Sequence, residues 1–247
     1  MPKRIRQQRR GKGKQVFRAP SFRFKFTSKY RGLDTLEQTG KLDGKVIDIV
    51  NDTARTAPLM IIHFENGENL SLPSPNKMRV GTKVAVGLDA PVAIGNVLPL
   101  GKIPAGTIIY NIELRPGDCG KLVKAGATSA KVVSHEGNKV VVRLPSKLFK
   151  SFNPKCRATI GEVSGFGRKE KPIIKAGVNY HVTRARGKYW PMVAGVAMNA
   201  INHPYGGKRR STQKSKKKPS PRNAPPGRKV GSIAPKRTGR RKGKVRR

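Results

Sequence analysis

The chain has 247 residues, of which 54 are Lys or Arg and 13 are Asp or Glu, so its formal net charge is +41. Like charges repel one another within a Debye length of about 8 Å, so this excess is unusual for an enzyme and predicts a polyanionic partner, with nucleic acid as the leading candidate. No run of about 18 apolar residues occurs and no apolar block follows the basic N-terminus, so we expect a cytoplasmic protein without membrane span or secretory signal.

The charge divides the chain into three parts. Residues 1–33 hold 12 basic and no acidic groups, residues 34–170 hold 19 basic and all 13 acidic groups, and residues 171–247 hold 23 basic and no acidic groups. The outer stretches, 1–14 and 208–247, are rich in Lys, Arg, Gly, Gln and Pro and offer too little apolar surface to offset chain entropy. We therefore expect both arms to be disordered alone and to take shape on a partner.

The middle of the chain predicts two sets of short strands. The first set is expected at residues 45–50, 59–64, 68–72 and 83–87. After a Gly/Pro-rich bridge at 95–106, the second set is expected at residues 107–112, 121–125, 130–135, 139–144 and 156–163, with a hairpin turn at 135–138. Almost nothing in 34–170 has helical periodicity, so the pattern favours an all-β core of two small barrels in tandem.

Motifs for catalysis or metal binding are weak. Cys119 and Cys156 are too far apart for a metal clip and are expected to be small buried side chains. A site of Asp43, Asp48 and Asp52 is disfavoured because Asp48 lies within an alternating strand pattern. The GFGRKE segment lacks the third glycine of a dinucleotide fingerprint. We expect no catalytic residue, metal ligand or cofactor, and magnesium only through RNA phosphates.

The histidines differ in their surroundings. His63, in an apolar run, and His135, in the predicted turn, are expected to be structural. His181 precedes a segment rich in Arg, Lys, Tyr and Trp, which fits either phosphate contact and stacking or a loop packed on the second barrel. His203 has Glu170 as its nearest upstream carboxylate, so a hydrogen bond to phosphate or a base edge is favoured over general-base chemistry.

Five strings in the sequence carry a family resemblance: GKGKQVFRAPSFRF (11–24), PGDCGKL (116–122), CRATIGEVSG (156–165), GVAMNAINHPYGG (195–207) and GRKVGSIAPKRTGR (227–240). In this order they resemble the markers of the large-subunit ribosomal protein L2 family in its archaeal form. Bacterial members read DHPHGGG where this chain has residues 202–208, so the acid before His203 is replaced and a proton relay is less favoured.

The resemblance implies an OB-fold barrel followed by an SH3-like barrel, with long basic non-globular extensions at both ends. The implied domains are a basic RNA-binding extension (1–33), the OB-like barrel (34–106), the SH3-like barrel (107–195) and a basic Gly/Pro-rich extension with the MNAINHPYGG loop (196–247). The implied role is a structural, non-enzymatic constituent of the large subunit that supports assembly, subunit association, tRNA positioning and the RNA-based peptidyl transferase centre. The implied partners are large-subunit ribosomal RNA, neighbouring ribosomal proteins and the small subunit, with no membrane or small-molecule substrate.

Basic, polar and aromatic residues in these segments form the predicted RNA interface. The residues expected to bind RNA are Arg4, Arg10, Lys14, Arg18, Arg23, Arg157, Arg184, Arg186, Lys188, Trp190, Asn199, His203, Lys208, Arg209, Arg210, Arg228, Lys229, Lys236, Arg237 and Arg240. Those expected near the peptidyl transferase centre are Asn202, His203, Pro204, Gly206 and Gly207. Phe22, Phe24, Tyr189 and Trp190 are suited either to stacking on bases or to packing at a barrel edge. Two other interpretations stay open: an RNA-processing enzyme using His203, and a general polyanion binder.

Overall fold

The structure is a computed structural model that describes residues 3–24, 26–168, 170–207 and 219–235. The chain divides into two compact units. We call Pro20–Asn179 the sheet unit, and Met1–Ala19 together with Tyr180–Arg247 the arm unit. No helix within the described ranges is both long enough and apolar enough to cross a membrane.

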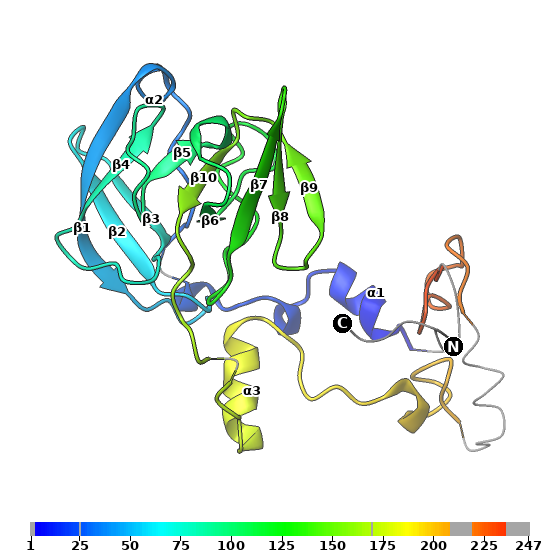
Figure 1. The fold of residues 1–247 in the computed structure, drawn as a ribbon. Coiled ribbons are helices and arrows are strands. Elements are labelled where there is room, and N and C mark those ends of the chain that lie inside the picture. Colours follow the sequence, from blue (N-terminus) through cyan, green and yellow to red (C-terminus); the bar gives the residue numbers. More distant parts are fainter. Residues whose placement is uncertain (1–2, 25, 169, 208–218, 236–247) are drawn as a thin grey trace. The chain divides into compact units, whose positions relative to one another are not determined.

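The sheet unit is built from short strands, as Figure 1 shows. The ten strands found in the described residues are β1 (Lys41–Val50), β2 (Leu59–Phe64), β3 (Asn69–Pro73), β4 (Lys83–Gly87), β5 (Val97–Pro99), β6 (Ile108–Tyr110), β7 (Ala130–Glu136), β8 (Lys139–Arg143), β9 (Phe149–Phe152) and β10 (Arg157–Ile160). They form one hydrogen-bonded sheet in the order β3-β2-β1-β4-β5-β10-β6-β7-β8-β9. The expectation of an all-β core is confirmed.

Helical segments are few in the described residues. The α-helices are α1 (Arg6–Gly11), α2 (Thr35–Thr39) and α3 (Ala176–Ala185), and the 3-10 turns are η1 (Gln15–Phe17), η2 (Ser21–Arg23), η3 (Leu100–Lys102) and η4 (Gly195–Ala197). Asp34 caps α2, because its side chain accepts a hydrogen bond from the backbone N–H of Glu37. The helix α3 crosses from the sheet unit to the arm unit.

The two larger hydrophobic cores of the described residues share this sheet, and Ala57, Tyr110 and Val163 form a small third cluster. The first packs side chains of β1, β2, β3 and β4 with Tyr30, and the second packs side chains of β5 to β10 with Leu100 and Ile103. The strands β4 and β5 pair in parallel and serve both cores. On β5, Val97 belongs to the first core and Leu98 to the second, because successive strand residues point to opposite faces. The second core therefore begins upstream of the boundary at 106 that the sequence suggested.

The predicted strands and the observed ones agree where apolar residues alternate or run together. The hairpin is confirmed: β7 and β8 pair up to Glu136 and Lys139, and Gly137 takes φ 53° in the two-residue turn. His135 lies in β7 and not in the turn. The strand expected at 121–125 is wrong, because Leu122 forms only an isolated bridge with Ile112. The strands β5 and β9 and the helices α1, α2 and α3 were not predicted from the sequence.

A buried ionic cluster joins the two cores and corrects one predicted RNA contact. Arg157 is only 3% exposed. Its guanidinium pairs with Glu37 at 2.6 Å and with Glu113 at 2.9 Å, and it donates to the carbonyl oxygen of Arg31 at 3.1 Å. Arg31 in turn pairs with Glu37 at 3.0 Å. Because its donors are committed inside the protein, Arg157 is not available to RNA, and the assignment to the RNA interface was wrong.

The two cysteines and the structural histidines lie in the sheet unit. Cys156 is fully buried, which raises the pKa of its thiol to about 11, whereas Cys119 is half-buried. His63 is exposed on β2 and contacts the side-chain oxygen of Asn69 at 2.8 Å. His135 contacts the carbonyl oxygen of Ile103 at 2.9 Å. These contacts within the fold support the structural assignment of both histidines.

Candidate nucleic-acid interface

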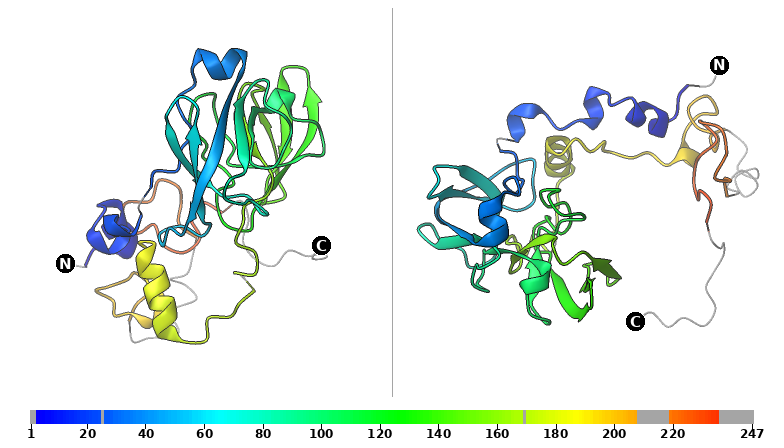
Figure 2. Two further views of the ribbon diagram at one scale, coloured as in Figure 1. Left: turned by 90° about the vertical axis from the view of Figure 1, so that its left-hand side faces the viewer. Right: turned by 90° about the horizontal axis from the view of Figure 1, so that it is seen from above.

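Two segments far apart in the sequence run side by side in the arm unit. The backbone N–H of Lys3 donates to the carbonyl oxygen of Ile201 at 2.9 Å, and Nη2 of Arg6 donates to the carbonyl oxygen of Val193 at 3.1 Å. Further along, the rings of Phe17 and Tyr189 lie 5.9 Å apart. These contacts pair the N-terminal segment with the segment after α3 in antiparallel fashion, as the right view in Figure 2 shows.

The N-terminal arm has more structure than the sequence predicted. Residues 3–14 were expected to lack structure without a partner, yet they include α1 and contacts with residues 193 and 201. The helix α1, with the sequence RQQRRG, has no apolar face of its own. Ile5, just before it, is buried, and the side-chain oxygen of Gln8 accepts from the N–H of Ile5 at 2.9 Å. The helix is therefore stabilised by contacts at its N-terminus and by the segment that pairs with it.

The segment 195–207 forms a tight loop. The backbone N–H of Gly207 donates to the carbonyl oxygen of Met198 at 3.2 Å, which closes it. A Cβ on Gly195 would overlap the ring of His203, and one on Gly206 would overlap the backbone of Asn199. Glycine at both positions therefore allows the loop to fold back on itself.

His203 is oriented by its own loop. Its Nδ1 accepts a hydrogen bond from the backbone N–H of Tyr205 at 3.0 Å, and the two rings meet edge to face at 5.1 Å. Burial, followed by the nearby positive charge of Arg6, lowers the pKa of His203 below 6.5. The neutral imidazole that results carries its proton on Nε2, because Nδ1 accepts.

The described part of the C-terminal segment, 219–235, packs on this loop. The hydroxyl of Tyr205 donates to the carbonyl oxygen of Val230 at 3.3 Å, and Val230 is buried. Ser220 Oγ donates to the carbonyl oxygens of Arg228 at 3.0 Å and Val230 at 3.1 Å. Arg228 and Lys229 are thus presented on a turn that is tied to the loop of His203.

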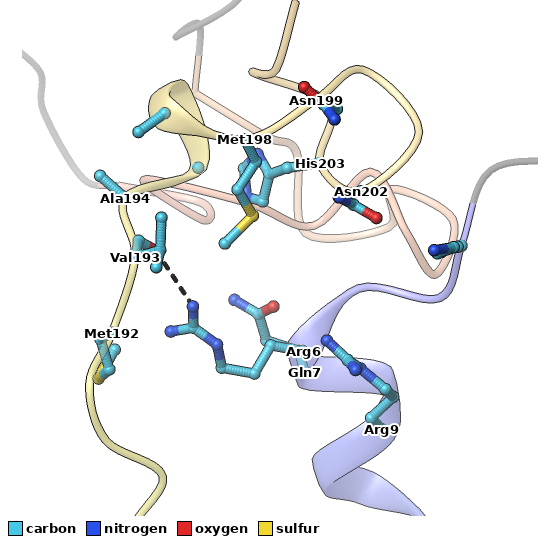
Figure 3. Close-up of a pocket in the computed structure, with 13 residues that line it drawn as sticks. Arg6, Gln7, Arg9, Met192, Val193, Ala194, Met198, Asn199, Asn202 and His203 are labelled. Carbon is cyan, nitrogen blue, oxygen red and sulfur yellow. Dashed lines mark hydrogen bonds between the residues drawn. The ribbon is translucent and has the colours of Figure 1, made fainter.

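A cavity of about 690 Å³ lies within the arm unit, between α1 and the segment that includes residues 192–203. Lys3, Arg6, Arg9 and Met198 are among the residues that line it, and none of its lining residues is acidic. Asn199, Asn202 and His203 also line it. In Figure 3 the side chains of Arg6 and Gln7 extend from α1 into the space below Met198. Such a cavity suits an anionic ligand with an apolar part.

The structure brings some of the predicted residues together and separates others. Exposed in the arm unit are Arg4, Arg10, Lys14, Arg18, Arg184, Lys188, Asn199, Asn202, Pro204, Gly207 and Arg228. Half-buried there are Arg186, Trp190, His203 and Lys229, whereas Gly206 is buried. Arg23 is half-buried in the sheet unit. Lys208, Arg209, Arg210, Lys236, Arg237 and Arg240 lie outside the described residues.

The predicted stacking residues are accessible to different degrees. Phe22 is 77% exposed and Phe24 is 44% exposed, and the guanidinium carbon of Arg23 lies 5.4 Å from the centre of the Phe22 ring. Tyr189 is 40% exposed and contacts Phe17 and the guanidinium of Arg6, whose carbon lies 5.0 Å from the ring centre. Its ring therefore packs within the arm unit, while Phe22 and Phe24 favour the stacking alternative.

His181 lies on α3 and not in a loop. It is exposed, and its ring meets that of Tyr180 at 5.5 Å. On the same helix Nη1 of Arg184 donates to the hydroxyl of Tyr180 at 3.2 Å. This spacing of four residues is a sequence signal for α3, as is the apolar spacing of Val178, Val182 and Ala185.

Sequence reasoning also missed residues that line the cavity. Lys3, Arg6 and Arg9 look alike in a run of basic residues, and Met192 and Met198 stand in an irregular segment. Only the antiparallel pairing of the two segments shows that they face a common space.

The three aspartates considered for a metal site each contact a different partner. Asp43 pairs with Lys41 at 3.0 Å, Asp52 pairs with Arg55 at 2.9 Å, and Asp48 Oδ1 accepts from the N–H of Ile49 at 2.7 Å. Among the described residues no group of three or more His, Cys, Asp or Glu side chains is placed to hold a metal ion.

Comparison with known proteins covers nearly the whole chain. The family model described as Ribosomal Proteins L2, RNA binding N-terminal domain matches residues 2–86, and that described as Ribosomal Proteins L2, C-terminal domain matches residues 93–224. The protein named Large ribosomal subunit protein uL2 of Methanothermobacter thermautotrophicus is 50% identical over 242 residues, 98% of this chain and 100% of its own length. The protein of the same name in Methanobrevibacter smithii is 49% identical over 239 residues, 97% of this chain and 99% of its own length.

Proposed function

The chain belongs to the ribosomal protein L2 family, and on that premise we propose that it is a structural constituent of the large ribosomal subunit that binds large-subunit ribosomal RNA in the cytoplasm. The observation that carries the proposal is the match along nearly the full chain to archaeal relatives named as large-subunit proteins. The charge supports it, because residues 1–33 and 171–247 contain no carboxylate.

The arm unit is the proposed RNA-binding surface. Arg4, Arg10, Lys14 and Arg18 are exposed on the N-terminal segment, and Arg184 and Lys188 are exposed on the segment that pairs with it. Each of these cations that approaches a phosphate releases condensed counterions, so about ten contacts give a salt slope of about −9 on duplex-like RNA. Phe22 and Phe24 in the sheet unit add exposed rings for unpaired bases.

We propose that the two cores correspond to the two barrels of the family. The first core, on β1 to β4, is assigned to the OB-like barrel, and the second, on β5 to β10, to the SH3-like barrel. The two family models meet between residues 86 and 93, close to the division between the cores at β4 and β5. The basic extensions, 1–33 and 196–247, then flank these barrels.

The loop 195–207 is proposed to lie near the peptidyl transferase centre and to act there by position. Its support is the MNAINHPYGG sequence, together with the closed conformation of the loop. The Nδ1 of His203 is occupied by its own loop, and the cavity beside it has no acidic lining residue to orient it as a base. We further propose a structural, non-catalytic role in assembly, tRNA positioning and association with the small subunit, as the family resemblance implies.

Sedimentation tests the proposal. In a sucrose gradient of cell extract, the protein is expected to travel with the large subunit at low salt and to leave it only at high salt. Purified protein is expected to prefer large-subunit ribosomal RNA over duplex DNA of equal length at moderate salt. Equal binding to both nucleic acids would instead support a general polyanion binder.

A further inference from the structure

We propose that the cavity between α1 and residues 192–203 holds one unpaired RNA nucleotide, with its phosphate on the basic residues of the N-terminal segment and its base against the methionine and asparagine side chains. This inference rests on the proposed function and names the ligand of one part of the RNA-binding surface.

The cationic side of the cavity fits a phosphate. Lys3, Arg6 and Arg9 all line it, and no lining residue is acidic. The guanidinium of Arg6 is fixed in place, because Nη2 donates to the carbonyl oxygen of Val193 at 3.1 Å and the group lies over the Tyr189 ring. A guanidinium has five N–H donors, so this bond leaves donors for a phosphate oxygen.

Apolar side chains among the lining residues fit a base. Met192 is 67% exposed and Met198 is half-buried, and both line the cavity. In Figure 3 the side chain of Met198 extends into the space above Arg6. A thioether is polarizable and packs well against an aromatic ring. A free phosphate ion would use the cations alone, whereas a nucleotide uses the cations and this apolar surface together.

Polar groups among the lining residues are suited to the edge of a base. Asn199 and Asn202 each offer an amide oxygen and an amide nitrogen, and His203 offers Nε2 because its Nδ1 accepts from Tyr205. A base paired in a helix has these edges engaged with its partner, so only an unpaired base is available to them. A volume of about 690 Å³ lies within the range of small-molecule sites and exceeds the need of a phosphate alone.

Methionine methyl signals provide the test. The full chain is labelled with ¹³C at the methionine methyl groups and titrated with adenosine 5′-monophosphate, and in parallel with inorganic phosphate. The base is expected to move the signals of Met192 and Met198 upfield through its ring current, while phosphate alone does not. Met60, which is fully buried in the first core, is expected to stay unchanged and reports that the fold is intact.

Two variants that each remove one positive charge distinguish binding in the cavity from general electrostatic attraction. Arg9→Gln removes a cation that lines the cavity, and Arg115→Gln removes an exposed cation of the sheet unit. The first is expected to weaken nucleotide binding about tenfold, as loss of a charged hydrogen bond does, and the second to leave it unchanged.

The outcomes are decisive for the cavity. If the methyl signals of Met192 and Met198 do not shift at nucleotide concentrations that saturate the sites responding to inorganic phosphate, the inference is wrong. Equal shifts of these signals with nucleotide and with inorganic phosphate would also overturn it. If those signals stay fixed while the chain still prefers ribosomal RNA, only the cavity assignment fails. If they move but ribosomal RNA is not preferred over DNA, the proposed function fails and the nucleotide site remains.

Discussion

At the scale of single residues, Arg157 neutralises carboxylates that the two cores bury. Glu37 and Glu113 each pair with it and have almost no exposed surface. We predict that Arg157→Met lowers the free energy of unfolding by about 3–5 kcal/mol, because it leaves the buried carboxylate of Glu113 without this ion pair and that of Glu37 with Arg31 alone. Urea unfolding at pH 7 measures this loss. Arg143→Met, at an exposed position on β8, is the control and is expected to change stability by less than about 0.5 kcal/mol.

The same variant has a pH signature. Burial raises the pKa of Glu37 above its usual value even with both arginines present, and loss of Arg157 raises it further. A carboxyl whose pKa is higher in the folded state than in the unfolded state favours folding at low pH, and this contribution is lost as pH rises through the folded pKa. The stability gap between variant and wild type is therefore expected to narrow from pH 7 to pH 5. A constant gap would mean that the buried charge is not the cause.

At the scale of elements, the loop 195–207 depends on glycine at its first position. We predict that Gly195→Ala pushes the ring of His203 away, because the added Cβ would overlap it. Overpacking of this kind costs about 1–3 kcal/mol, so the amide of Tyr205, which donates to His203, should exchange its hydrogen roughly five- to a hundredfold faster. Gly11→Ala, where nothing lies within 4 Å of the added Cβ, is the control. Equal exchange in both variants would refute the packing role.

The strands and helices also differ in how well the sequence pattern predicts them. The strands β1, β2, β7 and β8 have apolar runs or alternation and were predicted. The strand β5 is three residues long within a Gly/Pro-rich stretch, and β9 has a single buried side chain, Phe152, so neither has a pattern to detect. The helix α1 is polar all round and is held by contacts with residues near 193 and 201. Tertiary pairing of this kind has no periodicity in the sequence.

The candidate site could be predicted only in part, because tertiary pairing has no pattern in the sequence. Asn199 and His203 were predicted as site residues because they lie in a specific family string. Arg6 and Arg9 can be assigned to the site only from the cavity that they both line. Arg157 was misassigned because a basic residue in a family string looks the same whether it meets phosphate or a buried carboxylate.

At the scale of the whole molecule, the layout of charge predicts where RNA affinity resides. Changing Arg4, Arg10, Lys14 and Arg18 to Gln removes four exposed cations from the N-terminal segment. If each lies at a phosphate of duplex-like RNA, the slope of log affinity against log salt should become less steep by about 3.6. Filter binding to large-subunit ribosomal RNA at several salt concentrations measures this slope.

A matched change in the sheet unit distinguishes directed contact from general attraction. Lys77, Lys83, Lys102 and Lys139 are also exposed, and their replacement by Gln lowers the net charge by the same amount. Counterion release counts only the phosphates that a protein neutralises, so this variant should keep most of the original slope. Equal slopes in the two variants would mean that affinity follows net charge alone, and the arm unit would then have no special place in RNA binding.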